Sequence, residues 1–512
     1  MKMYKLSSFF LLALLLISIS ACSDLEETLN EDLTAEEAQI LLDGTDVDAL
    51  ILTAYESMFS PFQDQARYFC LQEHTSDEVI GPTRGPDWDD NGIWRVLHNH
   101  SWDADHLYVG DTFNELLQGV FNATNILNFD PSPEQGAEAR FLRAFFMYCV
   151  SDTWGQVPVR EPGEDLLNAP RVLKGSEAND FIISELEEIM PNLPDGKPDA
   201  AGRATKEAAK ALLMKAYINR GVYADRARPS FDNADMDKVI QYADEITANG
   251  SYSLADNYYD NFAINNGEVS PELIFTSKNT GGERGGNVRS RWYMTLHYNQ
   301  NPSGWNGFCT IADFYDKFTD DNDTRKSGEI PLQIDSSGIK MGFLEGQQVD
   351  QDGNDILDRK GNPLSYTREV AIQESGNNLE VTGVRAIKYQ IDYESGDLAD
   401  NDFVIYRYAD VLLMKAEALM RKGDNGAALA IVNEIRAKRG AAELTSLDEQ
   451  AMLDERGFEL WWEGHRRQDL IRFGKFLDAW NEKPESGAER LVFPIPNAAL
   501  AVNPNLEQNP GY

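Results

Sequence analysis

Hydrophobic side chains recur every three or four positions through most of the first half of the chain and again near its end. This spacing places apolar residues along one face of an α-helix. Leu116, Val120 and Leu127 illustrate it, and Leu117, Phe121 and Ile126 fall on the same side of the predicted helix. The predicted helices cover residues 36–59, 113–129, 138–150, 179–190, 205–223, 236–249, 405–421, 426–438 and 446–473.

Two stretches interrupt the helical pattern. Residues 60–112 and 251–400 contain frequent glycine and proline, which is typical of loops. Within the second stretch, residues 273–276 (LIFT) read as a short strand, and the Gly353 and Gly361 segments look like hairpin turns. The tail, with four prolines, is predicted to be extended. The fold class that follows is mainly α, with loop-rich segments and a few short strands.

An internal repeat supports a helical architecture. The pentapeptide LLMKA occurs at residues 212–216 and again at 412–416. The second copy continues through Gly423 and Asp424 into an alanine-rich segment, which gives a helix, a tight turn and a second helix. Small residues let two helices approach closely, and this arrangement resembles a tetratricopeptide unit. Coincidence among helices rich in alanine and leucine is the alternative.

The first 21 residues have the pattern of a secretory signal peptide. Two lysines precede an apolar run at residues 9–17, which is too short to span a bilayer, and small residues follow it. The run leads into Ile19-Ser20-Ala21-Cys22, which resembles a bacterial lipobox, in which the cysteine is lipidated and becomes the mature N-terminus. Ordinary cleavage, with Cys22 incidental, is the alternative.

A lipid-anchored protein outside the cell is therefore expected. Residues 1–21 would be removed, and residues 22–35 would form a tether lipidated at Cys22. No later segment has about 18 consecutive apolar residues, so acyl chains would be the only membrane anchor. The acidic residues after Cys22 resemble the surface-export signal of Bacteroidetes lipoproteins.

Charge and cysteine content exclude several classes of protein. The 512 residues include 85 acidic and 46 basic side chains, which gives a net charge of −39. Affinity for nucleic acid comes mainly from cations that neutralise phosphates, so a nucleic-acid partner is not expected. Apart from Cys22, only Cys70, Cys149 and Cys309 occur, without metal-ligand spacing, and buried free thiols are predicted.

Four segments, in order along the chain, resemble the signature segments of one family. They are EARFLRA at 138–144 with WGQVP at 154–158, YRYAD at 406–410, ERGFEL at 455–460 with EGHRRQDLIRFG at 463–474, and FPIP at 493–496 with the closing NPNLEQNPGY at 503–512. Together with the lipoprotein-like start, this set resembles the SusD/RagB family of outer-membrane nutrient-binding lipoproteins.

The resemblance implies a fold, a partner and a location. The fold would consist of tetratricopeptide-like helical repeats with a loop-rich ligand-binding region and a few short strands. Residues 36–250 would form the N-terminal SusD-like helical region and residues 251–512 the C-terminal region. The protein would bind a glycan without cleaving it, use no cofactor, and partner a SusC-like TonB-dependent transporter at the cell outer membrane. Peptide or glycopeptide cargo stays open.

Two loop segments combine aromatic side chains with polar neighbours, as a carbohydrate site requires. Sugar rings have apolar faces that stack on aromatic rings, and hydroxyls that pair with Asp, Asn or Arg side chains. In the family, loops from these two regions form the glycan site. For each tryptophan, packing in the core is the alternative. The predicted ligand-binding residues are Asp77, Arg84, Trp88, Trp94, Trp292, Tyr293, Trp305 and Asn306.

A glycoside hydrolase is the competing hypothesis from a different class. It needs two carboxyl groups that flank the scissile bond, and Asp77 and Asp87 are the candidate pair. Glu455, Glu459 and Glu463 recur every four residues and so share one helix face, where they cannot flank a substrate. We expect these three glutamates to link their helix to its neighbours.

Two segments contain residues of the types that bind metal ions. His98, His100, His106 and Asp103 could hold a transition metal, but no helix pattern supports this. The acidic segment around Gly353 is vaguely similar to a Ca²⁺ loop, although its spacing departs from the EF-hand pattern and a hairpin turn fits it better.

Overall fold

The computed structural model describes residues 45–512, and residues 46–512 form one compact unit. The predicted signal peptide, the lipidated Cys22, the tether at 22–35 and the start of the first predicted helix lie outside the described residues. Within residues 45–512, no helix combines the length and the apolar character that crossing a membrane requires.

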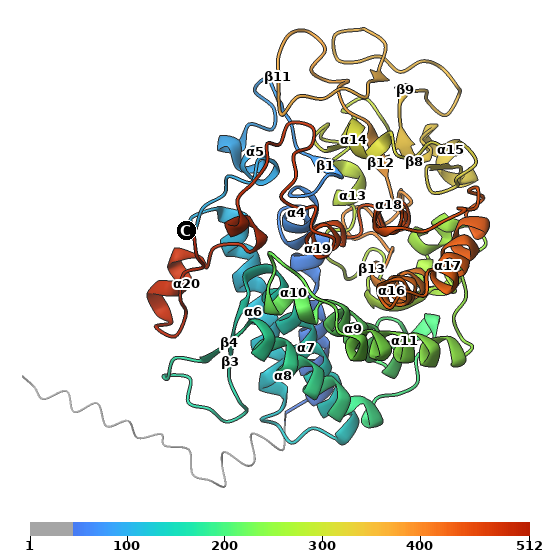
Figure 1. Ribbon diagram of the computed structural model, residues 1–512. Helices are drawn as coiled ribbons and strands as arrows, with labels where there is room; N and C mark the ends of the chain where they lie inside the picture. The colour runs from blue at the N-terminus through green and yellow to red at the C-terminus, as the bar shows by residue number, and fades with distance from the viewer. Residues whose placement is uncertain (1–44) are drawn as a thin grey trace, which may run out of the picture. The chain divides into compact units, whose positions relative to one another are not determined.

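The longer helices pack side by side in a continuous row, each against the next. In Figure 1, helices α6 to α11 fill the lower part of the view, whereas the loops around β9 and β11 lie at the top. This arrangement confirms the predicted mainly helical fold. The row consists of α3 (Val47–Glu56), α6 (Leu107–Ile126), α7 (Pro133–Trp154), α8 (Gly175–Ile189), α9 (Lys206–Ile218), α11 (Asn233–Ala248), α16 (Tyr408–Arg421) and α17 (Asn425–Lys438).

Shorter helices connect and flank the row. They are α4 (Tyr68–Glu73), α5 (Ile93–His98), α10 (Arg220–Ala224), α12 (Asn266–Val269), α13 (Ser290–Tyr293), α14 (Ala312–Tyr315), α15 (Pro331–Ser337), α18 (Glu449–Leu460), α19 (Arg466–Arg472) and α20 (Asn497–Val502).

The strands are short and form small separate sheets. The pairs are β1 (Val79–Ile80) with β6 (Cys309–Thr310), β2 (Thr83–Arg84) with β11 (Gln373–Glu374), β3 (Gln156–Val159) with β4 (Arg171–Lys174), β5 (Leu273–Ser277) with β13 (Phe403–Arg407), and β9 (Gly346–Gln347) with β10 (Ser365–Tyr366). A three-stranded sheet has the order β12 (Arg385–Ile387), β8 (Met341–Leu344), β7 (Ser327–Gly328). Among the strands of residues 45–512, only β2 and β11 run parallel.

Local capping sets the limits of α7, which begins earlier than predicted. Ser132 accepts a hydrogen bond from the Gln135 N–H (3.3 Å), and the Gln135 side chain accepts one from the Ser132 N–H (3.0 Å). Pro133 suits the first helical position because it has no N–H to leave unpaired. Gly155, at φ 73°, ends the helix in the left-handed region.

The two LLMKA copies lie on α9 and α16, and these helices contact each other. Both also pack on α11, which lies between them in the row. Both copies of the pentapeptide are therefore helical and belong to the same row of helices. The predicted division of the chain at residue 250 stays a prediction, because helices from both sides of it pack in this one row.

Two predicted helices contain a break that the periodicity did not show. The 405–421 segment starts as strand β13, because its β-branched and aromatic residues pair with β5 before α16 begins. The 446–473 segment bends between α18 and α19, where Trp462 (φ 58°) and Gly464 (φ 82°) take left-handed conformations.

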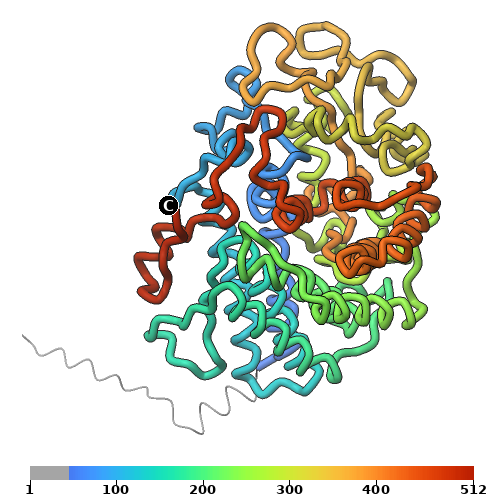
Figure 2. The backbone as a smooth tube through the Cα atoms, viewed as in Figure 1, coloured from blue at the N-terminus to red at the C-terminus, as the bar shows by residue number. Residues whose placement is uncertain are grey.

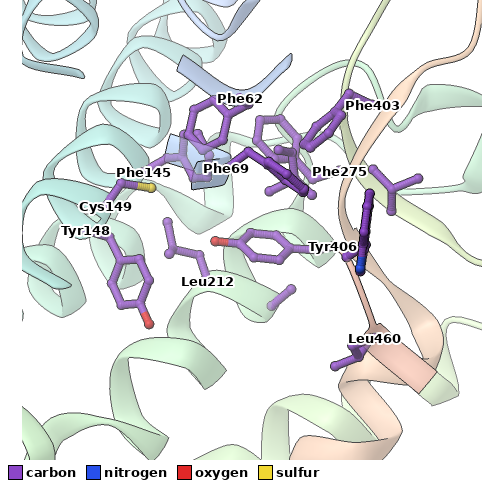
Figure 3. Packing of buried hydrophobic residues seen from close by; sticks show 14 of the residues in the cluster. Phe62, Phe69, Phe145, Tyr148, Cys149, Leu212, Phe275, Phe403, Tyr406 and Leu460 are labelled. Carbon is purple, nitrogen blue, oxygen red and sulfur yellow. The ribbon is translucent and has the colours of Figure 1, made fainter. Parts of the chain in front are cut away.

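The aromatic core lies where α7 meets strands β5 and β13. Figure 3 shows Phe145, Phe275 and Tyr406 close together in this cluster. The Phe145 and Phe275 ring centroids are 5.4 Å apart in an edge-on arrangement, which is a favourable geometry. Cys149 lies at the edge of the cluster, and all three described cysteines are buried and free, as predicted.

The C-terminal tail returns to the first third of the chain, as the red and blue segments of Figure 2 show. The Phe493 N–H donates to the Thr153 carbonyl (3.0 Å), and the Asn509 amide donates to the Trp154 carbonyl (2.8 Å). The tail is mostly extended, as predicted, apart from the short helix α20.

A buried cluster of charges joins α18 to the strands and loops around it. Glu459 pairs with Arg407 (2.7 Å) and with Arg439 (2.8 Å), and Glu463 pairs with Arg407 (2.8 Å). Glu455 pairs with Arg325 at 2.6 Å. These pairs confirm the predicted structural role of the three glutamates, because each one links α18 or the turn that follows it to a distant segment.

We predict that Arg407→Ala lowers the free energy of unfolding by roughly 3–5 kcal/mol, because the loss of one partner leaves buried carboxylates unpaired. Urea denaturation followed by circular dichroism measures the change. Arg228→Ala is the control, since Arg228 is an exposed residue that pairs with Asp225 at the surface, and it should change stability by less than about 0.5 kcal/mol. Equal effects of the two substitutions would contradict the prediction.

A second buried group holds the turn between α18 and α19. Glu73 accepts a hydrogen bond from the Gly464 N–H (2.6 Å), and Glu78 accepts one from the Trp462 N–H (2.9 Å). Burial raises the pKa of Glu73 to about 7. Burial, together with the neighbouring Glu73, raises the pKa of Glu78 well above its usual value. Protonated glutamates therefore help to fix this turn.

We predict that Glu73 makes the fold less stable as pH rises. The unfolded chain releases the Glu73 proton near its ordinary pKa of about 4.5, whereas the folded chain keeps it up to a pKa of about 7. Its stabilising contribution is thus complete below pH 4.5 and is lost as pH rises through about 7. Glu73→Gln, which can still accept the Gly464 N–H, should gain stability relative to the wild type as pH increases across this window. Denaturation of both proteins at several pH values tests this, and a pH-independent difference would refute it.

Candidate functional site

A short strand pair brings the two predicted loop segments together. Strand β1 pairs with β6 in the register Val79 with Thr310 and Ile80 with Cys309. The Trp88 segment follows β1, and the Trp305 segment precedes β6, so the two segments meet although more than 200 residues separate them in the sequence. The loops that carry the predicted residues therefore form one surface.

Trp305 and Tyr293 form an aromatic platform on this surface. The loop after α13 folds back on the helix, because the Trp305 N–H donates to the Tyr293 carbonyl (2.7 Å). The two ring centroids lie 5.9 Å apart, with 43° between the planes. Trp305 is 41% exposed, and Tyr293 is half-buried. An exposed indole beside a second ring can receive the apolar face of a ligand.

Trp88 fixes the loop that carries Trp305. Its indole N–H donates to the Trp305 carbonyl (2.7 Å), and its ring packs against Phe308 at 5.2 Å. Gly307 makes this close approach possible, since a Cβ there would lie 2.3 Å from the Trp88 ring. Trp88 (φ 60°) and Asn306 (φ 53°) both adopt left-handed backbone conformations, which cost about 1–3 kcal/mol each and cluster at functional sites.

The structure places two other predicted tryptophans in the interior. Trp94 is 2% exposed, packs against His74 and Phe308, and donates its indole N–H to Asp90 (2.8 Å). Trp292 is 1% exposed. The expectation that these two rings are exposed was wrong, because both pack in the hydrophobic core.

The predicted polar residues are also buried. Arg84 donates to the Thr382 carbonyl (2.9 Å), and Asn306 accepts a hydrogen bond from Arg385 (2.9 Å). Asp77 forms an ion pair with Arg466 (2.6 Å). These three side chains are buried and bonded to other parts of the protein, although Arg84 Nε and Asn306 Nδ2 have no hydrogen-bond partner, and the expectation that they face a ligand directly was wrong. They fix the loops that carry the platform.

Other polar side chains stand at the rim of the platform. The Arg289 guanidinium lies 5.0 Å above the Tyr293 ring and pairs with Asp397. Nearby, the Tyr298 hydroxyl donates to Asp87 (2.9 Å), and Arg359 also pairs with Asp87 (3.1 Å). These groups offer hydrogen-bond donors and acceptors near the platform. Arg359 and Asp397 carry no local sequence signal, because they lie far from the aromatic segments in the chain.

Asp77, one of the two carboxyl groups considered for a hydrolase, does not have the properties of a catalytic acid. Burial alone would raise the pKa of Asp77, but the charges of Arg466 and Lys317 outweigh it and hold that pKa well below its usual value. A glycosidase acid must instead keep its proton near neutral pH and reach the substrate. Asp77 is buried and its lowered pKa keeps it ionised near neutral pH, so it does not hold the proton that the acid must donate.

The histidines considered as metal ligands are engaged with the backbone. His98 contacts the Asn481 carbonyl (2.9 Å), His100 the Thr75 carbonyl (2.8 Å), and His106 the Ile93 carbonyl (3.1 Å). Among the residues that the structure describes, no group of three or more His, Cys, Asp or Glu side chains is arranged to hold a metal ion. The histidine cluster is therefore not a metal site.

The segment considered as a Ca²⁺ loop consists of turns. Asp350 accepts hydrogen bonds from the N–H groups of Asp352 and Asn354, both at 2.9 Å. Asp358 accepts bonds from Lys360 and Asn362 in the same way, both at 2.8 Å. Each aspartate closes its own hairpin turn, as the alternative interpretation predicted.

Comparison with known proteins gives consistent matches. Residues 271–490 match the profile of the SusD family. The starch-binding protein SusD of Bacteroides thetaiotaomicron is 27% identical over 420 residues, which cover 74% of this chain and 73% of the relative. A SusD-like protein, P38, of Formosa agariphila is 24% identical over an alignment that covers 100% of both chains.

Solved structures show the same fold. A SusD superfamily protein from Parabacteroides distasonis has a TM-score of 0.71 at 20% identity, with 91% of this chain and 98% of that chain covered. A surface glycan-binding protein A from Bacteroides thetaiotaomicron, in complex with laminarihexaose, has a TM-score of 0.65 at 19% identity, with 90% and 98% covered. The family profile over residues 271–490, the relatives, the helical fold and the four signature segments agree, and all of them point to the SusD/RagB family.

Proposed function

We propose that this protein is a surface-exposed lipoprotein that binds glycan chains and delivers them to a SusC-like TonB-dependent transporter, without cleaving them. The single observation that carries the proposal is the exposed Trp305 ring beside Tyr293. A ring left 41% exposed on a fixed loop forgoes burial that would stabilise the fold, and a sugar face can supply that burial.

The relatives support a glycan as the ligand. One relative is named a starch-binding protein, one similar structure is named a laminarin-binding SusD-like protein, and another holds laminarihexaose. Binding without cleavage is supported by Asp77, whose ion pair with Arg466 removes it from catalysis. The lipid anchor is supported by the lipobox-like sequence that ends at Cys22.

We predict that Trp305→Ala weakens glycan binding by roughly thirtyfold, or about 2 kcal/mol, because a stacking ring of this size acts as a hot spot. A glycan array with a parallel peptide panel identifies the ligand, and isothermal titration calorimetry then measures its affinity. The melting temperature should not change, since the ring is exposed. Trp305→Phe keeps an aromatic face and should retain part of the affinity.

Leu167→Ala is the remote control for this experiment. Leu167 is exposed on the loop between β3 and β4, outside the platform. Unchanged binding by Trp305→Ala would contradict the proposed site. Binding of peptides but not of glycans would redirect the proposal to peptide cargo.

We also predict that Cys22→Ala abolishes lipidation and releases the protein from the outer membrane, because no other anchor is expected. Fractionation of cells, with detection of the protein in the membrane and soluble fractions, measures this. Retention of the variant in the outer membrane at the wild-type level would refute the lipobox interpretation.

A further inference from the structure

A second pocket opens beside the platform. It lies between helix α15, the loop at residues 390–400, and two short segments at 264–265 and 280–281. Its volume is about 580 Å³, which is within the range of small-molecule sites in proteins. We call it the side pocket. None of the eight predicted ligand-binding residues lines it.

Two contacts link the segments around the side pocket to the loops that carry the platform. Asp397, on the pocket loop, pairs with Arg289, whose guanidinium lies over the Tyr293 ring. On the other side, Asn301 belongs to the same loop as Trp305 and donates to the Ser336 carbonyl of α15 (2.9 Å). The segments around the pocket are thus linked directly to the loops that carry the platform.

The apolar part of the pocket is built for a ring face. Tyr393 is half-buried, and its hydroxyl donates to the Ser337 hydroxyl (2.6 Å), which fixes the ring. Leu332, on α15, is 57% exposed at the pocket. An aromatic ring beside an exposed aliphatic side chain matches the apolar face of a sugar.

The polar part of the pocket offers acceptors that the fold holds in place. Asp392 accepts three backbone N–H groups, from Glu394, Ser395 and Asp400, each at 3.0 Å. One Asp400 oxygen accepts the Gly281 N–H (2.6 Å). These bonds rigidify the loop, so little free energy is lost in ordering it when a ligand binds.

Gln390 supplies an unused donor. Its side chain is 7% exposed and lines the pocket, and its carbonyl oxygen accepts the Ile264 N–H (3.0 Å). Its NH₂ group donates to no partner among residues 45–512. This amide nitrogen is not among the buried unpaired atoms of the described residues, so it is open to the pocket and can donate to a ligand hydroxyl.

The charge of the pocket selects the class of ligand. Asp392, Glu394 and Asp400 line it, and its lining includes no Lys or Arg. Carboxylates accept hydrogen bonds from hydroxyls but repel carboxylate and sulfate groups. A metal ion is not the occupant, since the described residues contain no group arranged to bind one.

We infer that the side pocket is a second glycan subsite, which binds uncharged sugar units of the same chain that stacks on Trp305. The inference rests on the proposed function and adds to it a preference for longer, neutral glycans. The pocket extends the contact between protein and chain, so affinity increases with chain length until the chain spans both sites.

The test compares wild-type protein with Tyr393→Ala, using linear laminari- and malto-oligosaccharides of two to eight units as probes. Calorimetry should show that Tyr393→Ala weakens binding of the longest probes about tenfold and leaves the shortest unchanged, since about 1.4 kcal/mol of contact is lost only where the pocket is filled. Tyr393→Phe, which keeps the ring and loses the bond to Ser337, should bind as the wild type does. Thermal melting of each variant reports on folding.

The outcomes separate this inference from the proposed function. If Trp305→Ala loses binding and Tyr393→Ala matches the wild type at every length, the side pocket is not a subsite, although the proposed function stands. An equal loss at all lengths would show that Tyr393 acts on the platform and would also overturn the inference. Absence of wild-type binding to every neutral probe would overturn both.

A second arm tests the preference for neutral chains. The probe is a long malto-oligosaccharide and its counterpart oxidised to carboxylates at C6. Wild type should prefer the neutral chain by about tenfold or more, and Asp400→Asn combined with Glu394→Gln should reduce that preference. Equal wild-type affinity for the two chains would contradict the assigned ligand class.

Discussion

Glu459 is the point at which distant parts of the chain are joined. It pairs with Arg325 (3.2 Å), Arg407 (2.7 Å) and Arg439 (2.8 Å), which come from a loop, a strand and the end of a helix. All four side chains are buried. Desolvation of so many charges is offset only when every partner is present, so the cluster favours one arrangement of its segments. The loops above α18 are thereby held at fixed positions relative to the helical row.

A rigid base is what allows a single aromatic side chain to stay exposed. Trp305 lies at the surface, while Trp94 and Trp292 fill the interior around it. The Trp88 indole donates to the Trp305 carbonyl and so fixes the loop that carries the exposed ring. The buried rings stabilise the interior, so the fold does not depend on burial of Trp305. A ligand therefore meets a preformed face and loses little free energy in ordering it.

Periodicity and signature segments predicted most of the fold, but they did not predict exposure. Helix α7 could have been placed to within a residue from Ser132, Pro133 and Gln135, whose capping pattern is local. Trp94 and Trp305 both lie in sequence segments rich in glycine and polar residues, and nothing in those segments separates the buried ring, on α5, from the exposed one.

The same limit applies to the partners of the site residues. Asp87 pairs with Arg359, and Arg289 pairs with Asp397, across more than 100 residues in each case. Glu455 and Glu459 were different, because their spacing of four residues placed them on one face of α18 in advance, whereas Glu463 lies in the turn after that helix. Regular spacing predicts which side chains share a face, whereas contacts between loops depend on the tertiary fold.

The contact between α11 and α16 has a consequence for how such proteins diverge. The chain leaves the row after α11 and re-enters it at α16, and these helices are neighbours. The long segment between them, which carries the platform rings and the side pocket, thus starts and finishes at adjoining places. The free energy of closing a loop becomes less favourable by only about 0.6 kcal/mol with each doubling of the loop length. Segments of different size and composition can therefore occupy this place. The ligand that such a protein binds can change while the sequence of the supporting helices stays the same.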